Sequence, residues 1–334
     1  MSKIKPAKGS PYARILGVGG YRPVRVVPNE VILETIDSSD EWIRSRSGIA
    51  TRHWASPQET VAAMSVEASG KAMADAGVSP EQIGAVIVST VSHFKQTPAV
   101  ATEIAHRIGA IKPAAFDISA GCAGFGYGLT LAKGLVVEGS AQYVLVIGVE
   151  RLSDLTDLED RATAFLFGDG AGAVVVGPSD EPAIGPTVWG SEGDKSETIK
   201  QTVPWDEYRR TDSGEKFPAI TQEGQAVFRW AVFEMAKVAQ QALDAAGITA
   251  DDLDVFIPHQ ANMRIIDSMV KTLKLPEHVT VARDVETTGN TSAASIPLAM
   301  ERLLATGAAK SGDTALVIGF GAGLVYAATV VTLP

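Results

Sequence analysis

The chain has 334 residues, of which 46% are hydrophobic and 20% charged, a composition that excludes a disordered or fibrous protein. Its net charge of −10 argues against a nucleic-acid partner and against adhesion to anionic membranes. A single cysteine excludes an internal disulfide and a cysteine-based metal cluster, and we expect no metal site. The N-terminal residues lack the apolar run of a secretion signal, and no segment is long enough to span a membrane, so we expect a cytoplasmic protein.

The sequence contains an internal repeat. Residues 74–88 read as the end of a helix, a glycine, a short acidic turn and an apolar strand. Residues 243–257 read the same way, and Gly247 takes the place of Gly77, a shift of 170 positions. Repeats of this kind indicate that one supersecondary unit occurs twice.

A second match supports the duplication. Residues 143–148 resemble residues 314–319 at a shift of 171 positions, almost the same offset as the first match. Two matches at nearly one offset are hard to ascribe to composition. We therefore expect a duplicated α/β fold with halves at 1–185 and 186–334, and a seam near residues 178–190.

Short runs rich in valine and isoleucine predict strands that are buried on both faces, as in a sheet covered by helices. Four such runs are Ala85–Ser89, Val144–Gly148, Val255–Pro258 and Ala315–Gly319.

Two glycine clusters, 168–177 and 319–326, resemble nucleotide-binding loops, but each is followed by a strand-like run and not by a helix. We interpret both clusters as tight turns between neighbouring strands. Residues 150–165 have no counterpart in the second half, and an insertion in one copy usually serves a site or an interface. Polar residues 192–216 are expected to form an exposed irregular segment.

Cys122 is the candidate nucleophile. It lies among small residues, in Ser-Ala-Gly-Cys-Ala-Gly-Phe, where a helix is expected to begin. The unpaired N–H groups and the dipole at a helix N-terminus stabilise a thiolate, and the glycines allow a substrate carbonyl to approach the backbone. A lone cysteine is more often a buried packing residue, so the assignment needs partners.

The repeat locates those partners. The position 170 residues after Cys122 falls within 289–297, a second small-residue stretch that enters a helix and contains Asn290. Among the five histidines, only His259 follows the C-terminal end of an apolar strand, where active sites of α/β proteins usually lie. If the halves pack about a pseudo-twofold axis, Cys122, His259 and Asn290 share one pocket.

These three motifs, in this order, resemble the Cys–His–Asn triad of the thiolase-fold condensing enzymes. The likeness is closest to the β-ketoacyl-acyl carrier protein (ACP) synthase III family, and it covers the chain from about Arg14 onward. It implies a five-layered α-β-α-β-α fold with pseudo-twofold related halves. Relatives with two catalytic cysteines do not fit the cysteine count, and elongating synthases carry a second histidine where this chain has Asn290.

The resemblance implies a two-stage Claisen condensation that initiates fatty acid biosynthesis. Cys122 would accept the acyl group of an acyl-coenzyme A (CoA), with the backbone N–H groups of Cys122 and Ala322 as the oxyanion hole. Malonyl-ACP would then lose CO2, and His259 and Asn290 would stabilise the enolate. The family commonly has glycine at the Ala322 position, so alanine is a mild departure.

The resemblance also implies substrate contacts. CoA, a substrate and not a cofactor, would contact Trp42, Arg46, Arg161 and Asn262. An acidic carrier protein would need cations at the entrance, and the candidates are Arg229, Arg264 and, more weakly, Lys271. Thr97 falls where the partner subunit of a homodimer lends a residue to the acyl pocket, and its small side chain predicts tolerance of branched or longer primers. The alternative for Arg229, Arg264 and Lys271 is that each lies on a solvent-exposed helix face and binds no partner.

Three alternatives stay open at this point. A type III polyketide synthase, or a specialised polyketide starter or ester-forming enzyme, would share the triad. A cysteine acyl hydrolase would need a histidine–carboxylate pair, and no acidic residue flanks His259 in the sequence. A non-catalytic acyl-carrier-binding protein would not be labelled at Cys122 by an acyl donor.

Overall fold

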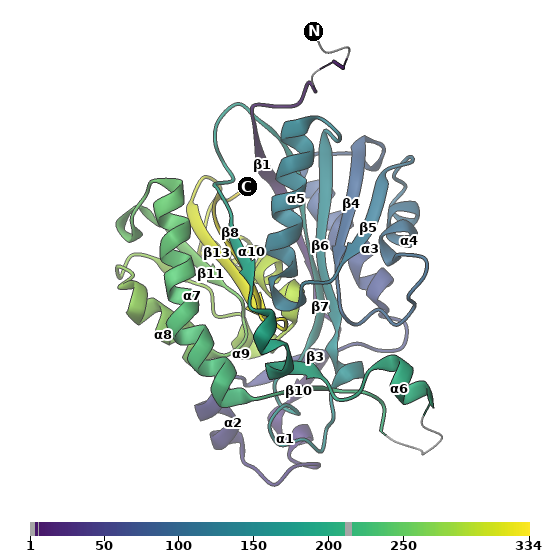
Figure 1. The fold of residues 1–334 in the computed structure, drawn as a ribbon, viewed down its shortest axis with the longest axis vertical. Coiled ribbons are helices and arrows are strands. Elements are labelled where there is room, and N and C mark those ends of the chain that lie inside the picture. Colours follow the sequence, from purple (N-terminus) through teal and green to yellow (C-terminus); the bar gives the residue numbers. More distant parts are fainter. Residues whose placement is uncertain (1–3, 6, 211–215) are drawn as a thin grey trace.

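The computed structural model describes residues 4–5, 7–210 and 216–334, and within them the strands form two five-stranded sheets and two small two-stranded ones (Figure 1). The first sheet contains β1 (Tyr12–Tyr21), β7 (Asp169–Ser179), β6 (Tyr143–Arg151), β4 (Ile83–Ser89) and β5 (Ala114–Ile118), in this order across the sheet. The second contains β8 (Val188–Ser191), β14 (Val325–Thr332), β13 (Thr314–Gly321), β11 (Val255–Pro258) and β12 (Thr280–Val281), again in this order.

The two sheets have the same topology. In each, the two strands at one edge pair antiparallel with their neighbours, and the three at the other edge run parallel. The predicted duplication is therefore confirmed, strand by strand. β7 ends at Ser179 and β8 begins at Val188, so residues 180–187 connect the two sheets.

Helices arrange the sheets into five layers. The outer face of the first sheet is covered by α3 (Val61–Ala76) and α4 (Val100–Arg107), and that of the second by α7 (Gly224–Ala246) and α8 (Met263–Leu273). Two central helices, α5 (Gly124–Glu138) and α10 (Ser295–Thr306), contact both sheets. The α-β-α-β-α order is the one that the resemblance implies.

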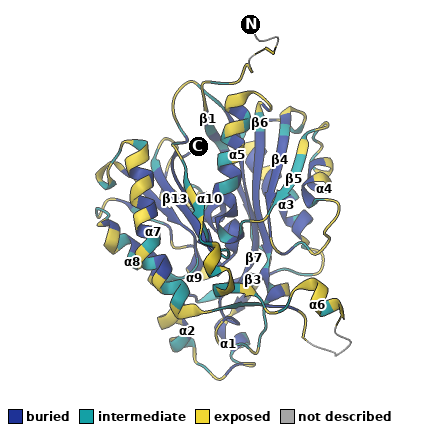
Figure 2. Ribbon diagram, viewed as in Figure 1, coloured by how far each residue is buried: buried dark blue, intermediate teal, exposed yellow. Residues whose placement is uncertain are grey.

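The central layer holds the molecule together. One buried hydrophobic cluster contains Val146 from the first sheet, Val317 from the second, and Phe125 and Ile296 from the central helices. Figure 2 shows this burial, with the strands and the inner helix faces in dark blue. Burial of apolar surface is the main favourable term in folding, so neither half has a complete core of its own.

The repeated segments share their local chemistry as well. Both α3 and α7 end at a glycine in the left-handed conformation, Gly77 and Gly247, with φ of 64° and 72°. Each is followed by a 3-10 turn closed by a capping box, formed by Ser79 with Gln82 in one copy and by Thr249 with Asp252 in the other. The same local signals therefore set the start of β4 and of β11.

Other elements lie outside the repeat. Between β1 and α3 are β2 (Arg25–Pro28), α1 (Asn29–Ile32), α2 (Asp40–Ser47) and β3 (Thr51–Trp54). Between β8 and α7 are β9 (Ile199–Gln201), α6 (Trp205–Arg210) and β10 (Ile220–Gln222), and α9 (Val285–Thr288) precedes α10. The 3-10 turns are η1 (Pro80–Gln82), η2 (Gly121–Ala123), η3 (Leu152–Leu155), η4 (Gly193–Thr198), η5 (Ala250–Asp252) and η6 (Ser292–Ala294).

Two sequence-based expectations need correction. The 168–177 cluster is not a turn, because all of its glycines except Gly168 lie within β7, where a Cβ on Gly172 would come within 2.6 Å of the Pro297 ring. The second cluster is a turn between β13 and β14, as expected. The polar segment after residue 192 is only partly exposed and irregular, because β9 pairs with β10 and lines a cavity; residues 211–215 of that segment lie outside the described residues.

Among the described residues, no helix combines the length and the apolar character that crossing a membrane would need.

Candidate active site

Cys122 lies in η2, the single turn that leads directly into central helix α5. The residue is half-buried and its sulfur faces a narrow cavity, and this desolvation raises the pKa of the Cys122 thiol to about 11. The Ser292 hydroxyl and the backbone N–H groups of Cys122 and Ala322 act against this shift and lower the thiol pKa. At neutral pH the candidate nucleophile is therefore a neutral thiol, and its proton would have to leave during an attack by the sulfur.

The end of β13 packs against this sulfur. A Cβ on Gly321 would lie 2.8 Å from Cys122 Sγ, closer than any real side chain approaches. The glycine thus lets the backbone of the second half bring the N–H of Ala322 beside the sulfur of the first half. The φ of Ala322 is not positive, so alanine causes no left-handed strain at this position.

His259 follows β11 and is 2% exposed. Its burial lowers the pKa of the imidazole to about 3, so the ring is neutral at physiological pH. Its Nδ1 lies 2.7 Å from Ser295 Oγ, and the ring packs edge-on against Phe320, with centroids 5.5 Å apart.

The hydrogen bonds around Ser295 are compatible with a His259 ring that carries its proton on Nε2. The backbone N–H of Gln260 donates to Ser295 Oγ at 3.3 Å, and the hydroxyl hydrogen of Ser295 can donate to His259 Nδ1. In this arrangement Nε2 is the nitrogen that is left for a substrate in the cavity, and neutral His259 is a hydrogen-bond donor there.

Asn290 is held by its backbone in a short bridge to Phe167. Its N–H donates to Leu166 O at 2.9 Å, and its carbonyl accepts from Gly168 N at 3.0 Å. The side-chain Oδ1 accepts from Ser292 N at 2.9 Å, so the orientation of the amide is set and its NH2 group is the free end. Asn290 therefore also presents a donor.

The three side chains line one cavity of about 220 Å³, together with Gly321 and Ala322. Its other walls are mostly apolar and include Leu152, Leu155, Phe167, Ile199 and Trp230. The sulfur, two backbone N–H groups and two side-chain donors thus converge from both halves of the repeat. The insertion at 150–165 contributes part of the wall, which is the kind of role expected of it.

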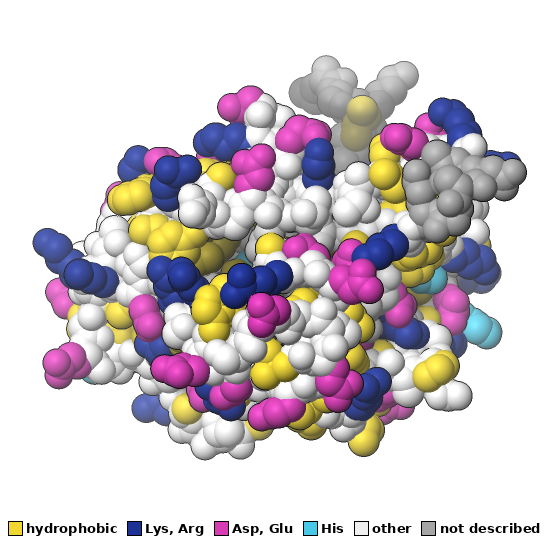
Figure 3. Space-filling model, turned by 90° about the horizontal axis from the view of Figure 1, so that it is seen from below, with side chains coloured by type: hydrophobic (Ala, Val, Ile, Leu, Met, Phe, Trp, Pro, Cys, Tyr) yellow, Lys and Arg dark blue, Asp and Glu magenta, His cyan; other side chains and the backbone are white. Residues whose placement is uncertain are grey.

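The cavity opens towards an outer cleft of about 780 Å³, and Asn290 and Ala261 line both spaces. Trp42 on α2 forms one wall of the cleft, with the guanidinium carbons of Arg161 and Arg46 5.0 Å and 5.8 Å from its ring centroid. Figure 3 shows the face on which these elements end, where Lys and Arg side chains gather beside a hollow with hydrophobic walls.

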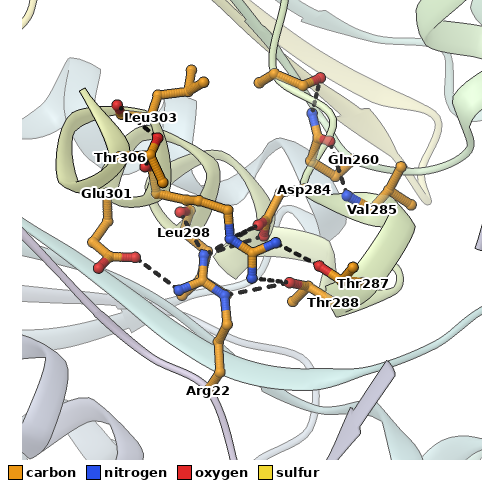
Figure 4. Close-up of polar contacts among 12 residues, drawn as sticks. Arg22, Gln260, Asp284, Val285, Thr287, Thr288, Leu298, Glu301, Leu303 and Thr306 are labelled. Carbon is orange, nitrogen blue, oxygen red and sulfur yellow. Dashed lines mark hydrogen bonds and ion pairs between the residues drawn. The ribbon is translucent and has the colours of Figure 1, made fainter. Parts of the chain in front are cut away.

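A polar network anchors the loop between His259 and Asn290 (Figure 4). Arg22, just after β1, donates to Asp284 at 3.2 Å, to Glu301 at 2.7 Å and to Leu298 O at 2.8 Å, and Arg302 also pairs with Asp284. The Asp284 side chain is almost fully buried, so these ion pairs are partly desolvated and fix the loop more firmly than surface pairs would.

Gln260, next to His259, completes this support. Its side-chain NH2 donates to Pro258 O at 2.7 Å, and its Oε1 accepts from Val285 N at 3.1 Å. The strand end that carries His259 is thereby tied to the helix that precedes Asn290. The relative position of the two donors is set by buried hydrogen bonds.

Comparisons with known proteins agree with this geometry. The C-terminal part of 3-oxoacyl-[acyl-carrier-protein] synthase III matches residues 243–333, and its preceding part matches residues 116–193. The chain is 86% identical to β-ketoacyl-[acyl-carrier-protein] synthase III 1 of Streptomyces coelicolor and 87% identical to β-ketoacyl-[acyl-carrier-protein] synthase III of Streptomyces glaucescens, each over 100% of both chains. The chain belongs to the β-ketoacyl-ACP synthase III family.

Among solved structures, the chain is similar to the priming β-ketosynthase from the R1128 polyketide biosynthetic pathway. The two share 48% identity at a TM-score of 0.97, over 100% of this chain and 99% of that one. As a member of the synthase III family, the chain is an acyltransferase that performs the initiating condensation of fatty acid biosynthesis.

The other residues singled out in the sequence occupy different places. Asn262, which also lines the cleft, caps α8 by accepting from Arg264 N at 2.8 Å, and it donates to Arg46 O at 3.0 Å. Its amide is thus largely engaged in holding α8 against α2. Arg229 and Arg264 line the cleft, whereas Lys271 lies on α8 away from it, and Thr97 is on an exposed loop outside this chain's own cavity.

Sequence reasoning missed several residues that shape the site. Ser292, Ser295 and Phe320 contact the triad, but each is an ordinary residue in the sequence, because its role depends on a partner from a distant segment. Ser292 and Ser295 lie in the same small-residue stretch as Asn290, and this was the one signal that could have pointed to them.

Proposed function

We propose that the site joins an acyl-CoA primer to malonyl-ACP through an acyl-cysteine at Cys122. The names of the relatives specify a β-ketoacyl product and an acyl carrier protein. The observation that carries the proposal is the convergence of one sulfur, two backbone N–H groups and two neutral side-chain donors in a cavity beside an arginine-rich cleft.

In the first stage, the Cys122 sulfur attacks the thioester carbon of the acyl-CoA. The negative charge that forms on the carbonyl oxygen needs donors already in place, and the N–H groups of Cys122 and Ala322 lie beside the sulfur to provide them. Collapse of this intermediate breaks the bond to the CoA sulfur and leaves the acyl group on Cys122. The apolar cavity walls accommodate the acyl chain.

In the second stage, the malonyl group on the carrier protein loses CO2. The electrons left behind form an enolate on the thioester oxygen, and His259 Nε2–H and the Asn290 NH2 group donate hydrogen bonds to it. Neutral donors suit this step, because they stabilise the enolate without protonating its carbon. The carbon then attacks the acyl-cysteine, which forms the β-ketoacyl chain and releases the Cys122 thiolate.

Labelling with acyl-CoA tests the proposal directly. Incubation with equimolar acetyl-CoA and isobutyryl-CoA is expected to add acyl mass to the peptide that contains Cys122, and malonyl-ACP is expected to remove it as β-ketoacyl-ACP. Because Thr97 is small, we expect the isobutyryl adduct to form at least as fast as the acetyl adduct. Strict acetyl labelling would refute the primer range alone, and an unlabelled Cys122 would refute the proposed function.

The Thr97 argument requires a second copy of the chain. Thr97 does not line its own cavity, and the loop that carries it is exposed. Among the described residues, the outer edge of β5 has no strand partner, and β5 lies beside this loop in the fold, as the bond from Thr90 N to Ile118 O shows. We propose a homodimer that places the loop of one protomer over the cavity of its partner.

Arg264 is proposed to receive the carrier protein. It lies at the start of α8 on the rim of the cleft, with its guanidinium carbon 5.0 Å from the Phe228 ring centroid, and Arg229 lies nearby on the same rim. Replacement of Arg264 with glutamate is expected to raise the KM for malonyl-ACP about 10-fold or more while acylation by acyl-CoA stays within 2-fold, since close charge pairs at interfaces are worth about 1.5 kcal/mol or more.

Lys237→Glu provides the matched control for that measurement. Lys237 is an exposed residue of α7 that pairs with Glu234, and it lies outside the cleft. The same change in charge there should leave the KM for malonyl-ACP within 2-fold. Equal effects at both positions would show that only overall charge matters, and Arg264 would lose its assigned role.

A polyketide starter enzyme is the second candidate, because the R1128 priming β-ketosynthase shares the fold so closely. The chemistry would be the same, and turnover with carrier proteins of the two pathways separates the candidates. The hydrolase alternative is disfavoured by the site itself. Among the described residues, the His259 ring is bonded to a serine hydroxyl and to no carboxylate, and burial keeps its pKa near 3.

A further inference from the structure

Glu150 is a buried carboxylate that the condensation steps above do not use. It lies near the end of β6, is 0% exposed and takes part in none of the ion pairs formed by the described residues. Its carboxylate is held by donors from the loop after β4, namely Ser92 Oγ at 2.6 Å, Thr90 Oγ1 at 3.2 Å and Val91 N at 3.1 Å. A buried carboxylate without a cation is costly, so its place beside the nucleophile calls for a reason.

The Ser292 hydroxyl connects this carboxylate to the nucleophile. It lowers the pKa of both the Cys122 thiol and the Glu150 carboxyl, and it lies on η6, which packs directly against β6 and against the turn η2 that carries Cys122. The packing is so close that a Cβ on Gly148 would lie 2.1 Å from Ala293 O. Ser292 is also held in the left-handed region, with φ of 48°, a conformation that costs a non-glycine residue about 1 kcal/mol or more.

We propose that Glu150 accepts the proton of the Cys122 thiol through the Ser292 hydroxyl, and that it returns this proton when the thiolate is released. The proposal rests on the condensation proposed above. During acylation, the thiol proton moves to Ser292 Oγ while the hydroxyl proton of Ser292 moves to Glu150, and the sulfur forms its bond to the acyl carbon as the CoA thiolate leaves. The CoA thiolate takes a proton from water.

The second stage closes the cycle. When the enolate carbon attacks the acyl-cysteine, the bond between the acyl carbon and the sulfur breaks and its electron pair stays on Cys122. Neutral Glu150 then protonates this thiolate through Ser292, which restores the thiol and the carboxylate. One turnover thus consumes a single proton from water, the one taken by CoA. In the acyl-enzyme, Glu150 is neutral.

The surroundings favour Glu150 over other acceptors. Burial raises the pKa of Glu150 to about 7, whereas the pKa of His259 is about 3, so the carboxylate is the stronger base of the two. The other charged groups on neighbouring strands are engaged elsewhere. Arg151 pairs with Asp154, and Asp169 accepts hydrogen bonds from Ala55 N and from Ser153.

The pH dependence of acylation tests this assignment. Because the acceptor must be ionised, the acylation rate of the wild type is expected to rise with pH through the pKa of Glu150, near 7, and then to level off. Glu150→Gln should lower acylation at pH 7 by about 100-fold or more, the usual contribution of a general base, and should abolish the inflection near pH 7. Malonyl decarboxylation, which needs no thiol proton, should stay within about 3-fold.

The opposite result would overturn the proposal. If the carboxylate acted only through its charge, which raises the thiol pKa, Glu150→Gln would acylate as fast as the wild type or faster. Ser292→Gly provides a second variant that should fold, since glycine suits the observed φ. It removes the hydroxyl, so it should also lose the inflection, and a retained inflection near pH 7 would refute the relay.

Asp169→Asn is the matched control. Asp169 is another buried carboxylate of the same sheet, its pKa is raised by burial, and its donors have no contact with Cys122. This variant should keep the wild-type pH profile of acylation, whatever stability it loses. If the wild type accepts no acyl group from CoA, the proposed function is refuted. If the pH profile of acylation is the same in the wild type and in Glu150→Gln, only this inference is refuted.

Discussion

Replacement of Cys122 with alanine is expected to abolish acyl transfer from acyl-CoA while malonyl decarboxylation remains measurable. The sulfur is the chain's only thiol, so no other side chain can carry the acyl thioester. The proposed donors for the enolate, His259 and Asn290, are held by Ser295 and Ser292 and do not depend on the sulfur for their positions. Release of labelled CO2 from malonyl-ACP measures the second activity, and transfer of labelled acetyl to protein measures the first.

Thermal unfolding is the control for this variant. Replacing the thiol group of a half-buried residue with a hydrogen atom should shift the midpoint temperature of unfolding by only a few degrees. Loss of both activities in a folded variant would contradict the division of labour between sulfur and donors. Full retention of acyl transfer would contradict the nucleophile assignment.

Removal of either enolate donor is expected to have the converse effect. His259→Ala and Asn290→Ala should each slow malonyl decarboxylation about 100- to 1,000-fold, because one donor to a developing oxyanion is worth roughly 3–4 kcal/mol of barrier. Acylation of Cys122 should fall less than 10-fold, since its oxyanion is stabilised by backbone N–H groups. Because the His259 pKa is about 3, the donor stays neutral from pH 5 to 8, and decarboxylation by the wild type should be flat over that range.

Asn290→Asp separates the lost donor from the lost volume. The carboxylate keeps the size of the side chain and can still accept from Ser292 N, but it replaces the NH2 donor with a negatively charged oxygen. Its decarboxylation rate should be at least as low as that of Asn290→Ala. A rate near that of the wild type would show that the amide fills space and does not stabilise the enolate.

The repeat in the sequence was enough to predict a duplicated α/β fold and the meeting of the triad, whereas the five-layered order came from the resemblance to the thiolase-fold condensing enzymes. The helix ends at Gly77 and Gly247 and the short capped turns after them are local sequence signals. They determine where the equivalent strands of the two halves begin. Once two copies are known to face one another, a cysteine at one helix start and an asparagine at the other must lie close together. These predictions needed no knowledge of any particular side-chain contact.

The details that sequence could not supply all depend on contacts between distant segments. Gly172 illustrates this. A glycine that is required because it packs closely against Pro297 cannot be told apart, in the sequence, from a glycine that is required by a turn. Glu150 likewise looks like a surface residue at the start of an insertion, and only the fold shows that it is buried behind the sulfur. The division at residues 185 and 186 and the roles of the individual site residues stay predictions.

The shared position of Asn290, at the junction of the outer cleft and the inner cavity, has a consequence for the order of events. Both substrates carry a long arm ending in a thioester, and both must present that end to the same sulfur through the same passage. The first carrier therefore has to depart before the second can be admitted. Turnover should follow a ping-pong scheme with parallel double-reciprocal lines, and free CoA should slow the enzyme by occupying the route that the second arm requires.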